Sequence, residues 1–291
     1  MSKPTIGFIG LGLMGLGCVT RYIEQGYRVV GFDVLADKVA AAKALGAEAA
    51  ASPADVLRRT DIVGCSVTTP ANVSDIVLGN DGLLSAGDQT GKIFVDHSTT
   101  PIDLTIELGQ RLSEGCAAEF VDAPVSGGPA AAEAGTLAIM AGGSASAIEI
   151  LRPALADLGT FTHMGAAGAG QATKLINQTL VLTNYCVIAE ALNLAERYGV
   201  DAAKIPDALA SGHAGSNLLP ILFERMIERD WAPRGYARQV LKDLEMLNDA
   251  AHAKGAAMPM SGQALTLFRM LVAQGKAEQD GASVFELLCK E

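Results

Sequence analysis

The amino-acid sequence predicts an α/β protein whose first half is a doubly wound parallel sheet and whose second half is entirely helical. Short apolar runs rich in β-branched residues recur along the first half, and amphipathic helical patterns alternate with them. Apolar strands of this kind are typical of parallel sheets that helices cover on both faces. A glycine-rich break near Gly165, after which β-like runs disappear, predicts the helical second half.

The elements of the first half follow in order. The chain opens with an expected strand, helix, strand and helix, at Thr5–Ile9, Met14–Gln25, Arg28–Phe32 and Leu35–Leu45. Four further β-like runs are expected as strands, at Ile62–Val67, Ile93–Asp96, Glu119–Val121 and Leu137–Ala141. A helix over Ala145–Leu158 completes this half. The pattern predicts two domains, residues 1–164 and 165–291, which suits a chain of 291 residues.

The second half begins with a long helical pattern at about Gln171–Tyr198. Its residues are apolar nearly all round, and a helix that is apolar on every side is expected to be buried on every side. Four shorter helical patterns follow, at Ala202–Ala210, Ile221–Ile227, Tyr236–Lys254 and Ser261–Gln274. We therefore expect a helical domain built around one central helix.

Composition and charge argue against several classes of function. The net charge of −10 argues against a nucleic-acid surface, because phosphate binding needs clustered Lys and Arg. The five cysteines have no C-x-x-C spacing and the four histidines no metal-ligand spacing, so no metal site is expected. The N-terminus has no secretory pattern, and no stretch has about 20 uninterrupted apolar residues. A cytoplasmic protein without membrane contact is expected.

A glycine-rich segment directly follows the first expected strand and opens the first expected helix. Three glycines have the spacing G-x-G-x-x-G, in which the first permits a tight turn, the second lets the backbone approach a pyrophosphate and the third lets helix and strand pack closely. The phosphates then lie on free N–H groups at the positive end of the helix. The pattern predicts that a dinucleotide binds to Gly10, Leu11, Gly12, Leu13, Met14 and Gly15.

Asp33 ends the second expected strand, about 20 residues beyond the glycines, where an acid that binds the ribose belongs. A carboxylate accepts hydrogen bonds from the ribose 2′-hydroxyl and repels a 2′-phosphate. The next residues, Val34 and Leu35, supply no arginine for that phosphate. NAD is therefore expected in preference to NADP. The alternative is that Asp33 only caps the following helix.

Lys174 lies in the first turns of the long apolar helix. Asn177 and Gln178 follow three and four residues later, so the three side chains share one face. The positive end of the helix dipole and burial both disfavour the ammonium and are expected to lower its pKa. Such a lysine suits an acid/base that interconverts a hydroxyl and a carbonyl group. The alternative is a surface lysine whose stem covers apolar neighbours.

Two other segments carry residues that suit ligand binding. Asp122-Ala-Pro-Val-Ser126-Gly127-Gly128-Pro129 follows an expected strand, where α/β sheets present their ligand sites. Its small residues expose N–H groups that suit a carboxylate, with the Ser126 hydroxyl as a further donor, although an ordinary Gly/Pro loop has the same composition.

Lys242 lies in a helical pattern among leucines and, from that pattern alone, belongs to a solvated helix face.

Over essentially the whole chain these motifs resemble the β-hydroxyacid dehydrogenases, a family that includes 3-hydroxyisobutyrate dehydrogenase and tartronate semialdehyde (2-hydroxy-3-oxopropionate) reductase. The matching segments are Gly7–Gly15, Asp96–Pro101, Asp122–Gly128, Gly135–Leu137 with Gly142-Gly143, Gly170–Gln178 and Lys242–Leu244. The resemblance implies a Rossmann-like N-terminal domain, a long inter-domain helix, an all-α C-terminal domain, and a homodimer or homotetramer. It implies hydride transfer between a nicotinamide cofactor and a small hydroxy acid or its semialdehyde, such as 2-hydroxy-3-oxopropionate, 3-hydroxyisobutyrate or a threonate-like acid.

The resemblance also implies roles for single residues. Lys174 is implied as the catalytic acid/base. Five residues are implied to bind the small carboxylate substrate: Ser126, Gly127 and Gly128 at its carboxylate, and Asn177 and Gln178 to orient it. Three further residues are implied to contact the cofactor, with the last reaching it from the second domain: Val67, Thr99 and Lys242.

The chain departs from the family pattern in three places. Gln178 stands where many members have Asn, which is similar to the tartronate semialdehyde reductase branch and to threonate dehydrogenase relatives. The segment Gly212-His-Ala-Gly-Ser216 is also similar to that branch. The usual Met-Leu-Pro after the third strand is replaced by Ser66-Val67-Thr68, and the usual Pro-Met-Ala of the first helix by Gly17-Cys18-Val19. Neither replacement removes a reacting group, but both argue against copying one subfamily's substrate.

Three alternatives stay open from the sequence. The first is a non-catalytic dinucleotide-binding module, against which the presence of Lys174 together with Ser126 and Gln178 argues. The second is an imine reductase, which shares the architecture but generally lacks a lysine at the position of Lys174. The third is a decarboxylating sugar-phosphate enzyme, for which the chain is short and has no evident arginine cluster for a phosphate.

Overall fold

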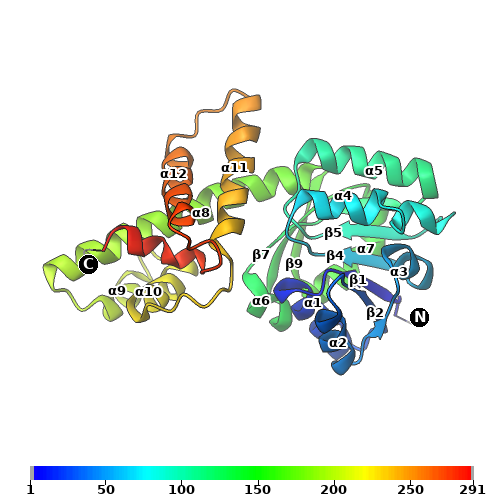
Figure 1. Cartoon of the computed structure of the whole chain (residues 1–291), viewed down its shortest axis with the longest axis horizontal. Helices are drawn as coiled ribbons and strands as arrows, with labels where there is room; N and C mark the ends of the chain where they lie inside the picture. The colour runs from blue at the N-terminus through cyan, green and yellow to red at the C-terminus, as the bar shows by residue number, and fades with distance from the viewer. Residues whose placement is uncertain (1–2, 290–291) are drawn as a thin grey trace. The chain divides into compact units, whose positions relative to one another are not determined.

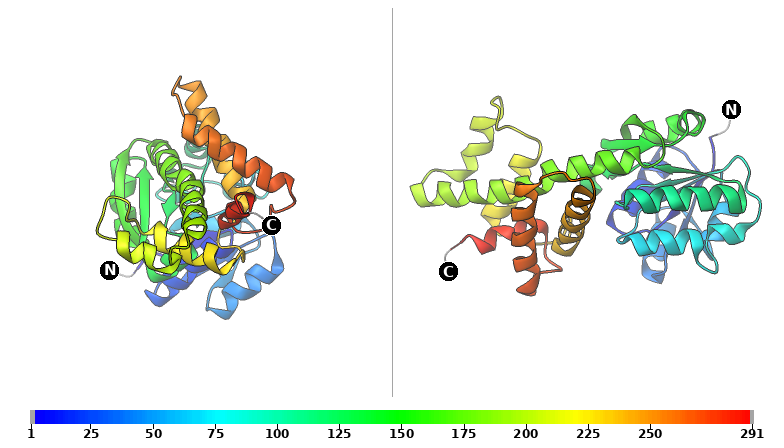
Figure 2. Two further views of the ribbon diagram at one scale, coloured as in Figure 1. Left: turned by 90° about the vertical axis from the view of Figure 1, so that its left-hand side faces the viewer. Right: turned by 90° about the horizontal axis from the view of Figure 1, so that it is seen from above.

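The computed structural model describes residues 3–289 and forms two compact units, the first ending at Lys174 and the second starting at Leu175. The division falls inside helix α8 (Ala169–Tyr198), whereas the sequence predicted a boundary between residues 164 and 165. Both views of Figure 2 draw α8, green to yellow-green, as one unbroken helix. A Rossmann-like α/β unit, a long helix and a helical unit confirm the predicted fold class.

The first unit is built on one sheet, which has nine strands within the described residues, in the order β3-β2-β1-β4-β5-β6-β8-β7 with β9 paired to β8. Their bounds are β1 Ile6–Ile9, β2 Val29–Phe32, β3 Glu48–Ala49, β4 Ile62–Cys65, β5 Ile93–Asp96, β6 Glu119–Asp122, β7 Val125–Ser126, β8 Leu137–Gly142 and β9 Gly159–Gly165. The first six strands pair in parallel. Because the order reverses between β1 and β4, ligands are expected at the carboxyl ends of these two strands.

Helices cover both faces of the sheet, and the central strands β1, β4, β5 and β6 contribute side chains to both cores. One core includes residues of α1 (Leu13–Glu24), α2 (Ala36–Ala44), α6 (Gly128–Ala134) and α7 (Ala145–Leu158). The other includes residues of α3 (Pro53–Arg59), α4 (Pro70–Leu78), η1 (Leu83–Ala86) and α5 (Ile102–Cys116). In β1, Phe8 enters the first core and Ile9 the second, as the alternation of side chains along a strand requires. Figure 1 shows α4 and α5 on one side of the strands and α1 and α2 on the other.

The second unit is helical. Beyond α8 it contains η2 (Ala202–Lys204), α9 (Ile205–Leu209), α10 (Leu218–Glu228), α11 (Ala237–Ala253), α12 (Pro259–Ala273) and η3 (Gly281–Leu287). Its core includes three fully buried aromatic side chains, Phe223, Phe268 and Phe285. A helix expected over Ala202–Ala210 is instead divided into η2 and the short α9, which starts next to Pro206.

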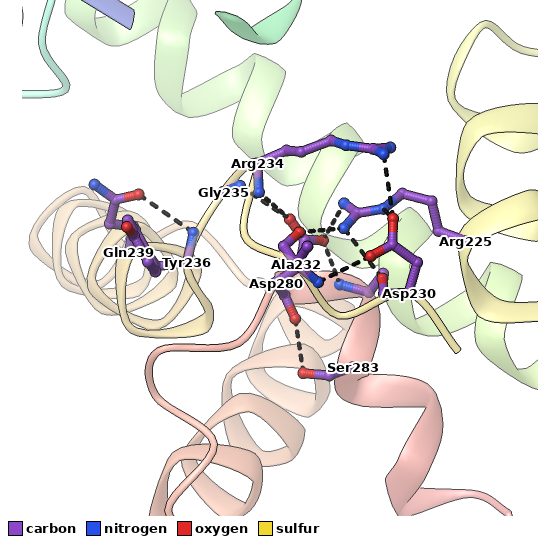
Figure 3. Close-up of polar contacts among 10 residues, drawn as sticks. Arg225, Asp230, Ala232, Arg234, Gly235, Tyr236, Gln239, Asp280 and Ser283 are labelled. Carbon is purple, nitrogen blue, oxygen red and sulfur yellow. Dashed lines mark hydrogen bonds and ion pairs between the residues drawn. The ribbon is translucent and has the colours of Figure 1, made fainter. Parts of the chain in front are cut away.

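A buried ion pair holds the loop that precedes α11 (Figure 3). Arg225 of α10 and Asp280, just before η3, are 4% and 1% exposed, and Nη1 lies 2.7 Å from Oδ1. The Asp280 carboxylate also accepts the backbone N–H groups of Arg234 and Gly235 at 2.8 and 2.9 Å. Arg225 donates to the main-chain oxygen of Ala232. These contacts join α10, the loop and η3.

The surface of α8 corrects one expectation, because the helix is not buried on every side. Ile176, Leu180, Val187 and Leu194 are 64%, 63%, 48% and 57% exposed. Their spacing of four, seven and seven residues places them on one stripe of the helix. Helix α8 is also long and apolar enough to cross a membrane. The core helix of a soluble protein can have the same length and composition, so these two properties do not assign α8 to a membrane.

Candidate active site

The glycine-rich turn after β1 has the geometry that a pyrophosphate requires. Gly10 has a φ of 86°, and a Cβ there would overlap the main-chain oxygen of Ser66. A Cβ on Gly15 would overlap the main-chain oxygen of Gly10, which shows how closely α1 packs on the turn. The Cβ position of Gly12 has no described atom within 4 Å, so a ligand can approach the backbone there. No described side chain caps α1 at Gly12, and the N–H groups of its first turn therefore fit phosphate oxygens.

Asp33 follows β2 and braces this turn. Its carboxylate accepts the N–H of Leu11 at 2.7 Å and the N–H of Leu35 at 2.9 Å. The first bond ties the glycine-rich turn to the end of β2, and the second supports the entry into α2. A carboxylate has about four lone-pair positions, so acceptors remain for a ribose hydroxyl. The capping role and the ribose role are therefore compatible in one side chain.

Val67 and Thr99 follow β4 and β5, at the same edge of the sheet. The Val67 side chain lies 2.7 Å from the Cβ position of Gly10, and its N–H donates to the Ser98 hydroxyl at 3.0 Å. Thr99 lies in the loop between β5 and α5. Val67 therefore lies directly beside the glycine-rich turn. Thr99 follows Ser98, the residue whose hydroxyl accepts the Val67 N–H. Their cofactor contacts stay predictions.

Lys174 is not a surface residue. It is 8% exposed, and its Nζ donates to the main-chain oxygen of Val125 at 2.8 Å. Val125 opens the short strand β7 and immediately precedes Ser126. The structure therefore brings the amine to the strand whose end carries the predicted carboxylate-binding residues, although these lie about 50 positions earlier in the chain.

The turn from β7 into α6 is shaped by two glycines. Gly127 and Gly128 have φ of 133° and 77°, which favour glycine, and the Cβ position of Gly128 has no described atom within 4 Å. Ser126 pairs with Ala138 of β8, which fixes the strand end that precedes the turn. A turn of this kind exposes successive N–H groups that suit a carboxylate. Lys174 and this turn together form the candidate active site of the first unit.

The remaining predicted residues lie in the second unit, where they form a chain of polar contacts. Asn177 Nδ2 donates to Gln178 Oε1 at 2.9 Å, and Gln178 Nε2 donates to Asp243 Oδ2 at 2.5 Å. Lys242 Nζ lies 3.0 Å from the other Asp243 oxygen. Lys242 is therefore ion-paired with its neighbour, and Asp243 sets the orientation of the Gln178 amide. The roles of these residues toward substrate and cofactor stay predictions.

The sequence reasoning assigned no role to two buried carboxylates at the edge of the sheet. Asp96 and Asp122 end β5 and β6, pair in register and are both fully buried. Burial raises the pKa of Asp122, and the charge of Asp96 acts in the same direction, while N–H donation from Gly168 and Gln171 opposes them. An acidic residue that closes an apolar strand was the one available signal. Each begins a segment, Asp96–Pro101 or Asp122–Gly128, in which the other residues carried the prediction.

Comparisons with known proteins agree with this arrangement. Residues 5–179 match the family model of the NAD binding domain of 6-phosphogluconate dehydrogenase. Residues 168–288 match the model described as NAD-binding of NADP-dependent 3-hydroxyisobutyrate dehydrogenase.

Similar proteins cover nearly the whole chain. A probable mitochondrial 3-hydroxyisobutyrate dehydrogenase-like protein of Arabidopsis thaliana is 37% identical, over 94% of this chain and 84% of its own. The 2-hydroxy-3-oxopropionate reductase of Escherichia coli is 32% identical, over 97% of this chain and 96% of its own. The solved structure of Mycobacterium tuberculosis 3-hydroxyisobutyrate dehydrogenase with L-serine is 29% identical, covers 99% of this chain and 100% of its own, and has a TM-score of 0.85.

Family matches along both units, together with the glycine-rich turn and the buried lysine, favour the dehydrogenase over the alternatives left open by the sequence. The chain belongs to the β-hydroxyacid dehydrogenase family, the NAD(P)-dependent oxidoreductases of small hydroxy acids.

Proposed function

We propose that the protein oxidises a hydroxy acid of three or four carbons, or reduces the corresponding semialdehyde, with Lys174 as the acid/base. The observation that carries the proposal is the buried Lys174 amine, held 2.8 Å from the main-chain oxygen of Val125, next to the turn of Ser126, Gly127 and Gly128. A substrate whose carboxylate binds this turn presents a nearby hydroxyl to the amine. Lys174 and the Ser126–Gly128 turn both belong to the first unit.

The chemistry of these residues follows from their donors and acceptors. The N–H groups of Gly127 and Gly128 and the Ser126 hydroxyl bind the carboxylate and fix the substrate. In oxidation the neutral Lys174 amine accepts the hydroxyl proton, and in reduction the ammonium returns it to the forming alkoxide. The bound nicotinamide ring supplies the hydride acceptor or donor. Burial of Lys174 limits exchange of that proton with water.

Substrate identity is tested with four compounds that the relatives' names and the sequence suggest. Three of them are hydroxy acids to be oxidised with NAD: 3-hydroxyisobutyrate, L-serine and threonate. The fourth, 2-hydroxy-3-oxopropionate, is to be reduced with NADH. We expect at least one of these reactions to change the absorbance of the reduced nicotinamide. The name of the Escherichia coli protein supports including the last compound, and the solved structure of the Mycobacterium tuberculosis protein with L-serine supports including L-serine. If NADH binds but none of the four reacts, the result favours the binding module over the enzyme.

We also propose that NAD is preferred over NADP, because Asp33 presents a carboxylate where the ribose is expected. Replacing Asp33 by alanine is expected to weaken NAD binding by about 10- to 100-fold, the loss of a charge-assisted hydrogen bond. NADP binding is expected to fall less, since the repulsion of the 2′-phosphate is lost as well. The measurement is the ratio of the two dissociation constants.

The ratio of the two dissociation constants distinguishes the two roles of Asp33, which are bracing the glycine-rich turn and binding the ribose. Loss of its bond to the N–H of Leu11 loosens the turn for both cofactors and leaves the ratio unchanged. Asp37→Ala, which removes an exposed carboxylate from the first turn of α2, is the matched control and is expected to leave both constants as they are. An Asp33→Ala ratio equal to that of the wild type would limit Asp33 to bracing the turn.

We propose further that the chain assembles as a homodimer or homotetramer. The support is the exposed apolar stripe of α8 at Ile176, Leu180, Val187 and Leu194, since a stripe of this length is unfavourable in water. Light scattering of the purified protein tests this, and a mass of one chain at micromolar concentration would reject it.

A further inference from the structure

The start of α8 is capped by a carboxylate from a strand of the sheet. Asp122, the last residue of β6, is fully buried, and its two oxygens accept the N–H groups of Gly168 and Gln171, both at 2.8 Å. Two glycines leave the space for this carboxylate: a Cβ on Gly142 would lie 2.7 Å from one oxygen, and a Cβ on Gly170 2.8 Å from the other. The contact therefore satisfies N–H groups at the helix start and fixes the helix to β6.

A second contact joins the same turn of α8 to the loop after β5. Gln171 is fully buried, its Oε1 accepts the N–H of Thr100 at 3.1 Å and its Nε2 donates to the main-chain oxygen of Ser98 at 2.9 Å. The carboxamide thus spans Thr99, the predicted cofactor contact. Asp96 holds the loop from the other side, because it accepts the Ser98 N–H at 2.8 Å and the Thr100 hydroxyl at 2.6 Å.

These two contacts determine where Lys174 lies. Gln171 and Lys174 are three residues apart and therefore share one face of α8 on consecutive turns. With the first turn fixed to β6 and to the loop after β5, the helix can neither slide nor rotate without breaking hydrogen bonds that are shielded from water. The Lys174 amine then meets the main-chain oxygen of Val125, three residues after Asp122. All these residues belong to the first unit.

We propose that Asp122 and Gln171 are positioning residues, a clamp that sets the Lys174 amine at proton-transfer distance from the substrate hydroxyl. The inference rests on the proposed role of Lys174 as the acid/base. Proton transfer needs the heavy atoms within about 2.6–3.2 Å, and a displacement of about 1 Å costs on the order of 100-fold in rate. Neither residue takes part in the proton transfer itself.

The test uses Gln171→Met, which keeps the volume and removes both hydrogen bonds, and Asp122→Asn, which turns one acceptor into a donor facing a backbone N–H. For each variant kcat is expected to fall by about 10- to 100-fold. The rate is measured with the compound among the four that reacts fastest, with hydrogen and with deuterium at the position of the transferred hydride. That position is the hydroxyl-bearing carbon of a compound oxidised with NAD, or C4 of NADH when 2-hydroxy-3-oxopropionate is reduced. The deuterium isotope effect on kcat is expected to rise, since a misplaced acid slows the chemical step. Rates are normalised to the NADH bound per chain, so partial unfolding does not imitate the effect.

A matched control separates positioning from stability. Ser52→Ala removes the cap of α3 in the same unit, where the Ser52 hydroxyl accepts the N–H of Asp55 at 3.1 Å. It is expected to lower the melting temperature without changing kcat or the isotope effect. If Gln171→Met and Asp122→Asn behave like Ser52→Ala while Lys174→Ala is inactive, the clamp is rejected and the proposed function stands. If Lys174→Ala keeps its activity, both proposals fall. Should Asp122→Asn not fold, Gln171→Met alone decides.

Discussion

Replacing Lys174 by alanine is expected to lower kcat by about 10²- to 10⁴-fold, the usual contribution of a general acid or base. The amine is the buried group that the structure places next to the Ser126–Gly128 turn, and alanine can neither accept nor return the proton. The affinity for NADH is expected to change little, because the glycine-rich turn and Asp33 are untouched. Steady-state kinetics and NADH fluorescence titration measure the two quantities on one preparation.

Two further variants make this result specific. Lys174→Arg keeps the positive charge but holds its proton at all accessible pH values, so it is expected to be nearly as inactive as alanine. Lys92→Ala is the matched control, because Lys92 also donates to main-chain oxygens, those of Leu57 and Arg58, at 2.6 and 2.9 Å. It is expected to keep the wild-type kcat. A Lys174→Ala enzyme with more than about 10% of the wild-type kcat would remove the lysine from the mechanism.

Features with a local sequence pattern were predicted from the sequence. The glycine-rich turn is one, because the strand, the three glycines and the helix are contiguous, and the overlaps at Gly10 and Gly15 show why those residues are glycines. Asp33 is another, since it ends β2 and bonds the N–H groups of Leu11 and Leu35. In each case the sequence pattern that predicted the residue is local, although Asp33 contacts Leu11, 22 positions earlier, and the Cβ position of Gly10 meets Ser66, 56 positions later.

Short strands and the surface of α8 were harder to predict. The two-residue strands β3 and β7 carry too few residues for an alternation to be detected, and β9 contains Gly and His and has four of its seven residues exposed. On α8, apolar residues occur all round the helix, and their pattern does not say which of them another element covers. Ile176 and Leu180 are exposed although Leu182 and Leu192 are buried.

The clamp at the start of α8 escaped the sequence analysis for a different reason. Gln171 bonds Ser98 and Thr100, more than 70 positions earlier, and Asp122 bonds Gly168 and Gln171 across more than 45 positions. No local spacing encodes such pairs. The sequence identified Lys174 because Asn177 and Gln178 share its helix face. The contacts of Asp122 and Gln171, which hold the start of the helix, depend on which strand ends lie side by side in the folded sheet.

The buried ion pair of the second unit gives the largest expected effect on stability. Replacing Asp280 by alanine is expected to lower the free energy of unfolding of this unit by about 3 kcal/mol, because the buried Arg225 then keeps only the more distant carboxylate of Asp230, whose Oδ2 lies 3.7 Å from Nε. Three N–H groups also lose their acceptor: those of Arg234, Gly235 and Ala282. Urea unfolding followed by the fluorescence of Trp231, the single tryptophan of the chain, reports on this region directly, since its main-chain oxygen accepts the Asp280 N–H at 3.0 Å.

The two ends of the pair are expected to differ. Arg225→Met leaves Asp280 with its three backbone donors, so its loss of stability is expected to be smaller than that of Asp280→Ala. Glu278→Ala breaks the exposed pair with Arg238, in which the side chains are 71% and 39% exposed, and is expected to leave the urea midpoint unchanged. Equal losses for Asp280→Ala and Glu278→Ala would mean that the pair at Arg225 contributes no more than a surface contact. A larger loss for Arg225→Met than for Asp280→Ala would assign the stability of the loop to the main-chain oxygens that the arginine binds, and not to the carboxylate.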